Sequence, residues 1–404
     1  MTIPLSKPDI GELEIAYVTK VLRSGALSLG PCLRQFEERF AAYVGSRYAI
    51  ATSSGTSALH LCVRALGIGA NDEVITTSFS FVASTNCLLY ERALPVFVDI
   101  DSSTLNIDAG KIEEFIESNC VRHPHDGRLM DRQTGREVKA ILPVHVFGFP
   151  CAMDALGEIA RKYRLLVIED ACEALGAEYD SRRVGTWGDV GVFAFYPNKQ
   201  MTTGEGGIIV TDDEKIALLC RSMRNQGRDE SSAWLHHVRL GYNYRLSDIQ
   251  CALGLAQLER IDHILCARAA VAARYDQVLA RTPFIQLPPS FSHKAKRSWF
   301  VYVVQIDATN PRPLRDRVLR GLFECGVGCQ AYFPAIHRQP YLHDLSKEGL
   351  LPKTSLPRTE AASDRCIALP FFSTESEREI ACVGELLQQT LEKEAGIQSE
   401  YVTQ

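Results

Sequence analysis

The stretch Phe195-Tyr-Pro-Asn-Lys-Gln-Met-Thr-Thr-Gly-Glu-Gly-Gly207 decides the fold of this chain and places Lys199 between two apolar segments. Val190–Phe195 precedes the lysine and the β-branched run Ile208–Thr211 follows it, so both flanks predict short buried strands. One proline and a glycine cluster allow a tight connection in the interior. An amine held there loses hydration, which favours the free base, a nucleophile toward carbonyl carbon. Since most lysines lie in water, this hypothesis depends on which other residues converge on Lys199.

Length and composition favour a soluble globular enzyme. The 404 residues are 46% hydrophobic and 23% charged, which is ordinary for such a protein. The net charge of −5, without a long basic block, argues against nucleic acid and an anionic membrane as partners. The 13 cysteines contain no Cys-x-x-Cys pair, and the N-terminus has no apolar leader. We therefore expect reduced thiols and a cytoplasmic location.

The first half of the chain alternates between strand and helix patterns. From Tyr48 to Ile168 this alternation predicts a mainly parallel sheet with helices on both faces. The pattern is lost over residues 120–138, a polar stretch that indicates a surface hairpin. His123 and His125 in that stretch lack cysteines or carboxylates at ligand spacing, so we predict no metal site.

The second half has a different pattern. A long helix is predicted from Asp248 to about Val278, bridging two domains. Beyond it, predicted strands at Ser298–Ile306 and Gln330–Phe333 are interspersed with helices, which is typical of an α+β domain. We expect a larger α/β domain over residues 1–262 and a smaller α+β domain over 263–404.

Two further positions could carry chemistry. The turn Ser53–Ser57 joins a predicted strand to a predicted helix, and its free N–H groups and hydroxyls could bind an anion or simply cap the helix. The apolar strand Leu165–Ile168 delivers Asp170 at its carboxyl end, where ligands collect in parallel α/β sheets. A surface or helix-capping acid is the alternative at that position.

Together these residues fit pyridoxal 5′-phosphate (PLP). Lys199 would hold the aldehyde as an imine, and Asp170 would keep the pyridine nitrogen protonated, which makes the ring an electron sink. An aromatic side chain such as Phe81 could stack on the ring. The phosphate would be bound by Gly55, Thr56 and Ser57. From the residues alone, PLP chemistry is indicated but no particular reaction.

Ordered motifs along nearly the whole chain show a family resemblance. They are Ser53–Leu61, Ser78–Phe81, Phe97–Asp101, Pro143–His145, Ile168–Ala171, Phe195–Lys199 with Gly204–Gly207, and Gly241–Arg245. By these motifs the sequence resembles the DegT/DnrJ/EryC1/StrS aminotransferases, fold-type I PLP enzymes that aminate keto sugars attached to nucleotides.

The resemblance implies roles for individual residues. Lys199 corresponds to the Schiff-base lysine, Asp170 to the partner of the pyridine nitrogen and Phe81 to the aromatic residue on the ring. Gly55 and Thr56 match phosphate-binding positions. The family's substrates imply L-glutamate as the amino donor and a nucleotide-linked keto-deoxysugar as the acceptor.

Further positions concern the partner subunit and departures from the family pattern. Asn243 matches an asparagine that reaches the phosphate bound by the neighbouring subunit, which implies a homodimer with shared active sites. Glu173 stands where the family often has Gln or His near the cofactor. Ala194 replaces a common phosphate-binding serine, a loss of about 0.5–1.5 kcal/mol for one neutral hydrogen bond. The stretch 120–138 is longer than in compact members.

Three functions remain open from the sequence. The first is transamination of a nucleotide-linked keto-deoxysugar, a step of polysaccharide or antibiotic sugar biosynthesis. The second is another PLP reaction on sugars, such as elimination or epimerisation. The third is a non-catalytic regulator with the same fold, against which the presence of both Lys199 and Asp170 argues. The nucleotide, the sugar and the carbon that is aminated are not specified by the sequence.

Overall fold

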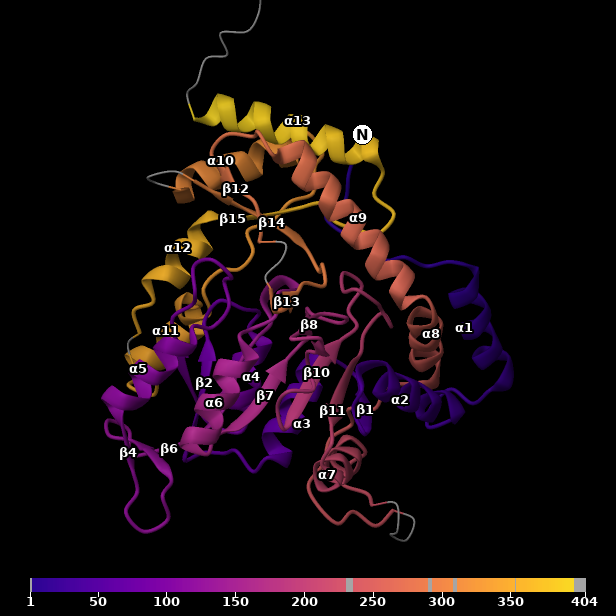
Figure 1. Cartoon of the computed structure of the whole chain (residues 1–404). Coiled ribbons are helices and arrows are strands. Elements are labelled where there is room, and N and C mark those ends of the chain that lie inside the picture. Colours follow the sequence, from indigo (N-terminus) through magenta and orange to yellow (C-terminus); the bar gives the residue numbers. More distant parts are fainter. Residues whose placement is uncertain (1, 230–234, 290–292, 308–310, 353, 396–404) are drawn as a thin grey trace, which may run out of the picture.

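The computed structural model describes residues 2–229, 235–289, 293–307, 311–352 and 354–395. A central sheet packed between helices occupies the lower part of the molecule in Figure 1, and a smaller sheet with its own helices lies above it. The long helix α9 (Ile261–Leu279) leads from one part to the other. Within the described ranges, no helix is both long and apolar enough to span a bilayer.

Among the residues that the structure describes, nine strands form the central sheet. Seven form its main path, in the order β1 (Tyr48–Thr52), β11 (Gly207–Thr211), β10 (Val190–Ala194), β7 (Leu166–Asp170), β6 (Glu137–Leu142), β2 (Asp72–Thr77) and β3 (Leu94–Val98). All pairs from β10 to β3 are parallel, whereas β11 runs antiparallel to both neighbours. The connection from β10 to β11, residues 195–206, consists of turns and contains no helix of the kind that usually carries a parallel crossover. The mainly parallel sheet expected from the sequence is confirmed, with β11 reversed.

The remaining two strands of this sheet form the hairpin predicted for residues 120–138. β4 (Cys120–Arg122) pairs with β5 (Leu129–Asp131), and β5 contacts β6 through one bridge, between Met130 and Glu137. The hairpin projects from the lower left of the molecule in Figure 1. Its polar sequence is consistent with this exposure, because only one side of it meets the core.

Helices cover both faces of the central sheet. One face carries α3 (Gly55–Ala65), α4 (Ala83–Tyr90) and α7 (Glu214–Arg224). The other carries α2 (Pro31–Val44), α5 (Ala109–Asn119), α6 (Met153–Tyr163) and α8 (Asp248–Glu259), with α1 (Glu12–Ser24) packed outside α8. Successive residues of a strand point to opposite faces, so a strand that is buried on both faces is expected to be mostly apolar.

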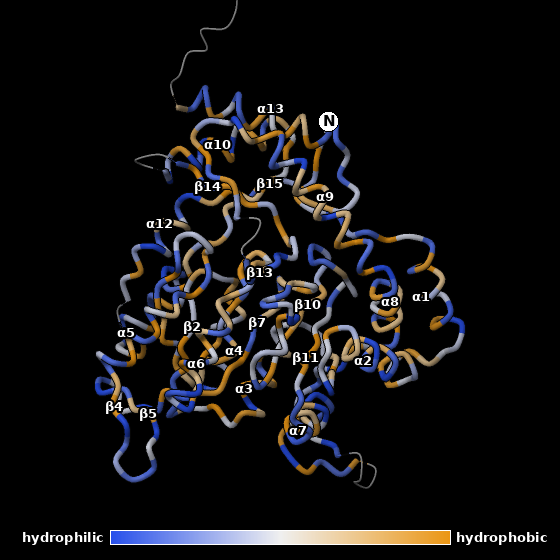
Figure 2. Tube along the Cα trace, viewed as in Figure 1, coloured by the Kyte–Doolittle hydropathy of each residue, from blue (hydrophilic) through white to orange (hydrophobic). Residues whose placement is uncertain are grey.

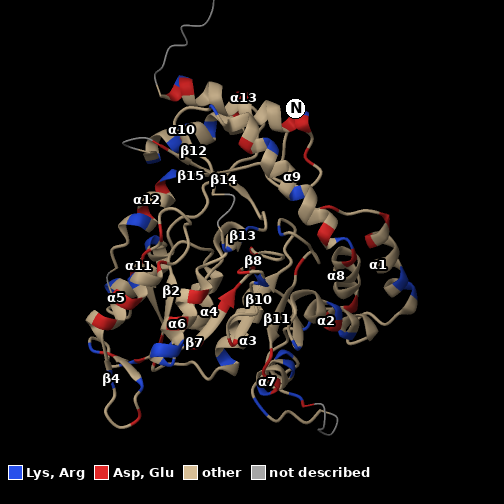
Figure 3. Cartoon of the chain, viewed as in Figure 1, with Lys and Arg blue, Asp and Glu red and all other residues tan. Residues whose placement is uncertain are grey.

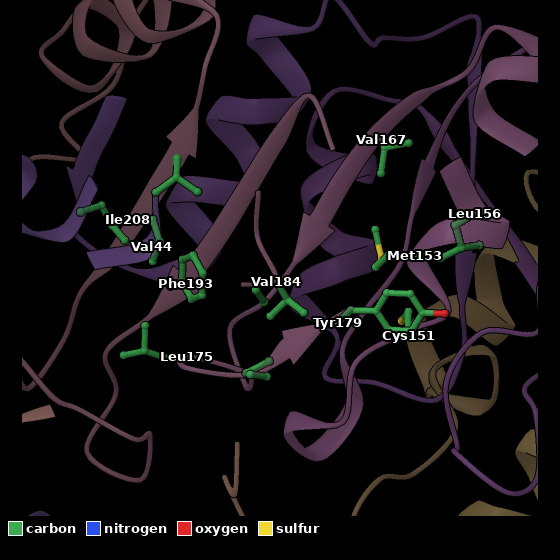
Figure 4. Close-up of a cluster of buried hydrophobic side chains, with 14 of the residues drawn as sticks. Val44, Cys151, Met153, Leu156, Val167, Leu175, Tyr179, Val184, Phe193 and Ile208 are labelled. Atoms are coloured by element: carbon green, nitrogen blue, oxygen red, sulfur yellow. The ribbon is translucent and has the colours of Figure 1, made fainter. Parts of the chain in front are cut away.

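Strand β11 shows this alternation directly. Ile208 and Val210 pack into the core cluster beneath α2, and Ile209 packs into the cluster beneath α3. Figure 4 shows Ile208 beside Phe193 of β10 and Val44 of α2 in the first cluster. The apolar colouring of the central strands in Figure 2 follows from burial on both faces.

The smaller part is built on a three-stranded antiparallel sheet. Its order is β12 (Ile285–Gln286), β14 (Tyr302–Ile306) and β15 (Cys366–Leu369). The helices of this part are α9, α10 (Pro311–Glu324), α11 (Pro340–Lys347), α12 (Pro357–Arg365) and α13 (Glu377–Glu394). A short third sheet joins β8 (Glu178–Tyr179), β9 (Arg182–Arg183) and β13 (Ala295–Lys296). Charges of both signs are interspersed along the helices of both parts (Figure 3).

Two sequence predictions in this region are wrong. The single helix expected from Asp248 is divided at Arg260, whose guanidinium is hydrogen-bonded to Asp9 and Glu14 at the N-terminus of the chain. These long-range contacts stabilise a break that the local pattern does not reveal. The strand expected at Gln330–Phe333 is reduced to one bridge to Ala368, because the chain then turns away to line a cavity.

Candidate active site

A cavity of about 400 Å³ opens at the carboxyl ends of β7 and β10. This is the edge at which parallel α/β sheets bind ligands. Its walls come from the α3 and α4 N-termini, the β10–β11 connection and the segment before β14. Side chains and backbone from these elements line it, among them Gly55, Thr56, Phe81, Ser84, Asp170, Cys172, Glu173, Ala194, Asn198, Lys199, Phe300, Tyr332 and Phe333.

Lys199 lies on the connection between β10 and β11, as expected. The backbone turns there because the Lys199 N–H donates to the carbonyl of Tyr196 and the Thr203 N–H donates to that of Phe195. Gly204 follows with a φ of +80°, a conformation that favours glycine. The lysine side chain is 14% exposed, so its amine is largely removed from water.

The Lys199 amine has two close neighbours. Its Nζ lies 3.6 Å from Glu173 Oε1 and 3.9 Å from the centre of the Phe300 ring. Glu173 is buried, and its Oε2 accepts the Phe147 N–H at 2.9 Å. Burial raises the pKa of Glu173, an effect that the positive charge of Lys199 partly offsets. The carboxyl group of Glu173 can therefore exchange a proton with the amine beside it.

Asp170 is the last residue of β7 and is 4% exposed. Its Oδ2 accepts from the Ser84 hydroxyl at 2.9 Å, and its Oδ1 accepts from the Cys172 N–H at 3.1 Å. Two donors hold the carboxylate in one orientation at the cavity wall. The position of Asp170 therefore favours a functional acid at the end of a strand over a surface or helix-capping acid.

The Gly/Ser turn combines both roles considered for it. Ser54 is the N-cap of α3, and its hydroxyl accepts the Ser57 N–H at 3.0 Å. Gly55 and Thr56 nevertheless line the cavity, so the first turn of the helix faces it. A β-carbon on Gly55 would lie 2.8 Å from that of Ala194, which explains the glycine. The Ser57 hydroxyl instead contacts the hydroxyls of Ser53 and Ser54 and is not part of the lining.

Phe81 lines the cavity, whereas Asn243 does not. Phe81 is 60% exposed, so part of this residue is available to a ligand. Asn243 is exposed and does not line this chain's cavity; its backbone bridges to Asn225. The carbonyl of Tyr244, next to it, accepts the Ser53 N–H at 2.8 Å.

Several cavity residues were not found from the sequence. Ser84, Tyr332 and Phe333 come from segments far from Lys199, and nothing in their local sequence marks them. Asn198 precedes the lysine in the opening stretch, and its Oδ1 is buried without a hydrogen-bond partner. An unpaired buried acceptor in a cavity is a sign of a missing ligand, although the sequence alone cannot show it.

The residues present fit PLP. The cavity offers a lysine amine for the aldehyde, a carboxylate held by two donors for the ring nitrogen, and the start of a helix for the phosphate. The unpaired Oδ1 of Asn198 can accept one further hydrogen bond. Among the residues that the structure describes, no group of three or more His, Cys, Asp or Glu side chains could hold a metal ion.

A fold-type I sheet with this cavity defines a PLP-dependent enzyme. The chain belongs to the DegT/DnrJ/EryC1/StrS aminotransferase family, because its residues 8–388 match the sequence pattern of that family. It is 38% identical over 378 residues to the GDP-perosamine synthase of Caulobacter vibrioides, covering 91% of this chain and 96% of that protein. It is 34% identical to the Bacillus subtilis spore coat polysaccharide biosynthesis protein SpsC, with 94% of each chain covered.

A solved structure agrees in fold and cofactor. The sugar aminotransferase Spr1654 of Streptococcus pneumoniae, described as putative and solved in its PLP form, superposes with a TM-score of 0.87 at 25% identity. The match covers 98% of this chain and 100% of that one. The protein is therefore a PLP-dependent sugar aminotransferase.

Proposed function

We propose that this enzyme transfers the amino group of L-glutamate to a nucleotide-linked keto-deoxysugar, with PLP bound to Lys199 as a Schiff base. The observation that carries the proposal is the placement of Asp170 at the end of β7 and of Lys199 on the connection after the neighbouring strand β10, both lining one cavity. The Caulobacter relative is named for a GDP-linked amino sugar, which supports a nucleotide-linked acceptor.

The roles of the residues follow from their contacts. When bound, PLP supplies an electron sink for the bond that breaks at the amino-bearing carbon. Asp170, fixed by Ser84 and the Cys172 N–H, would hold the ring nitrogen in its protonated form. The amine of Lys199 would take up the proton from the substrate carbon, and the carboxyl group of Glu173 lies 3.6 Å from that amine.

Binding of the cofactor uses the surrounding walls. Gly55 and Thr56, at the start of α3, would hold the phosphate, and Phe81 would hold the ring. Ser57 contributes by holding the Gly/Ser turn through its hydroxyl contacts rather than by binding the phosphate directly. Because Asn243 does not line its own chain's cavity, we assign it to the phosphate of a second subunit in a homodimer with shared sites.

Organisation and location complete the proposal. We assign residues 1–262 to a large PLP-binding domain and 263–404 to a small domain, with the boundary next to the break between α8 and α9 at Arg260. All 13 cysteines are free thiols, which supports a reducing, cytoplasmic location. Neither nucleic acid nor a membrane is required as a partner.

The test is a screen of nucleotide-linked 4-keto and 3-keto sugars with L-glutamate, read by mass. We expect an amino-sugar product and 2-oxoglutarate, and neither with Lys199→Ala. Borohydride reduction of the wild type followed by peptide mapping should place the pyridoxyl group on Lys199. Amination by Lys199→Ala, or a label on another lysine, would refute the assigned site. Conversion of a sugar without 2-oxoglutarate would indicate elimination or epimerisation instead.

A further inference from the structure

The amine of Lys199 lies close to both a carboxylate and the face of an aromatic ring. Phe300 is 1% exposed, and the centre of its ring is 3.9 Å from Nζ, which also lies 3.6 Å from Glu173 Oε1. The ring face is electron-rich and attracts an ammonium group, more strongly where water is excluded. The ring thus provides a defined position for the amine of Lys199.

The backbone of Phe300 is held by a buried arginine from α9. Arg268 is 4% exposed; its Nε donates to the Trp299 carbonyl at 2.8 Å and its terminal nitrogen donates to the Phe300 carbonyl at 2.6 Å. Burial lowers the pKa of Arg268 to about 10, which shows how costly it is to keep this guanidinium in the interior. The guanidinium also lies 4.9 Å from the centre of the Phe371 ring. Two charge-assisted hydrogen bonds therefore fix the segment that carries Phe300.

This segment joins the two cores of the molecule. The Trp299 side chain packs into the core of the smaller part, and the Phe300 side chain packs into the core beside the central sheet. Just before them, the Ser298 N–H donates to the Gly148 carbonyl at 3.0 Å. The Gln200 amide, adjacent to the lysine in sequence, contacts the Ser298 hydroxyl at 3.3 Å. The position of the ring is thus determined from both parts of the chain.

We propose that Phe300 is a positioning residue for the amine of Lys199, and that Arg268 holds Phe300 in place through its carbonyl oxygen. This inference rests on the proposed function, in which Lys199 is the reacting amine. The ring faces the amine whenever the amine is free and directs it along the cavity wall beside Glu173. Loss of the ring leaves the amine able to adopt other rotamers, which lowers the rate of proton transfer.

The direct test is a nuclear magnetic resonance experiment on the full-length chain freed of cofactor. Reductive methylation with ¹³C-formaldehyde converts lysines to dimethyl-lysines, which keep their charge and their attraction to an aromatic face. The Lys199 methyl signal is identified by its absence in Lys199→Arg. In the wild type we expect this signal upfield of the signals from the other dimethyl-lysines, because the ring current of Phe300 shields methyl groups that lie over its face.

Substitutions then separate the ring contact from general packing. The upfield shift should be lost in Phe300→Leu and in Phe300→Met, two variants that keep an apolar side chain, and retained in Phe300→Tyr. Phe333→Leu is the matched control: this ring also lines the cavity, but its contacts are to Phe79, Phe147 and Tyr332 rather than to the lysine. Arg268→Met should reduce the shift, since the carbonyl contacts that hold Phe300 are lost.

Kinetics of the glutamate half-reaction give the functional readout. In Phe300→Leu we expect kcat to fall by about 5- to 30-fold, the factor that corresponds to one desolvated cation–π contact. KM for glutamate should change by less than about twofold, because a ring that positions the amine acts on kcat rather than on substrate binding. A wild-type Lys199 signal without an upfield shift, or the same shift after Phe300→Leu, would overturn the inference. If the shifts behave as expected but Lys199→Ala still aminates sugars, the ring contact stands and the proposed function fails.

Discussion

Glu169, the residue before Asp170, has a fully buried carboxylate whose replacement by glutamine should be strongly destabilising. Its Oε1 accepts the backbone N–H groups of Trp187 and Gly188, and its Oε2 accepts that of Gly185 at 2.7 Å. The fourth donor is His145, whose Nε2 lies 3.1 Å from Oε2. One side chain thus fixes the loop after β9 and supports the strand end that delivers Asp170.

The magnitude follows from counting acceptors. Glu169→Gln keeps one oxygen, which can serve two of the N–H groups, but its NH₂ group then faces the Gly185 N–H and the His145 ring. A change of tautomer cannot relieve the clash, because the Cys151 N–H donates to Nδ1 of His145 at 3.0 Å. Two buried donors therefore lose their acceptor, at about 1–3 kcal/mol each. We expect the free energy of unfolding to fall by about 4 kcal/mol.

The assay is urea unfolding at a fixed protein and cofactor concentration, because binding and assembly shift apparent stability. Glu178→Gln is the control: this carboxylate is 29% exposed and lies 3.4 Å from Lys296, so its loss should cost less than about 1 kcal/mol. A Glu169→Gln variant within about 1 kcal/mol of the wild type would refute the reasoning, since it would show that the four donors find other acceptors.

Three further predictions concern the cofactor, the assembly and the response to pH. Asp170→Asn should keep the fold and bind PLP, but its kcat for amination should fall at least about 100-fold, because an amide cannot stabilise the protonated ring nitrogen. Near-normal turnover in this variant would show that the carboxylate is only structural. Mixed Lys199→Ala and Asn243→Ala subunits should regain activity above either parent, since each heterodimer has one intact shared site; verified heterodimers without a gain would contradict the shared site. Burial raises the pKa of Glu375 to about 8 from 4.5, although it accepts from the Tyr275 hydroxyl at 2.8 Å. Because the folded-state pKa is raised, the contribution of Glu375 to stability is full below about pH 4.5 and is lost as the pH rises toward 8. The free energy of unfolding of Glu375→Gln should therefore increase by about 1–3 kcal/mol relative to that of the wild type between pH 5 and pH 8. If the difference in urea midpoint between the two proteins is the same at both pH values, this prediction is wrong.

Local sequence patterns predicted the elements of the central sheet well. The alternation predicted from Tyr48 to Ile168 includes β1 at Tyr48–Thr52 and β3 at Leu94–Val98, since a short apolar run between polar turns has few alternatives to a buried strand. The strand prediction failed at Gln330–Phe333, where the run leaves the sheet after one bridge and lines the cavity. Apolar character indicates burial, but it does not specify what the residue is buried against.

The sequence by itself determined the α/β class, the family and the lysine and aspartate that face one cavity, because each depends on residues adjacent in the chain and on strand ends that a parallel sheet aligns. Only the tertiary structure decided how the amine of Lys199 is held. Folding brings Phe300 to this amine and Arg268 to the backbone of Phe300. Such contacts join residues distant in sequence, and their geometry depends on how two cores pack against each other, which no local pattern encodes.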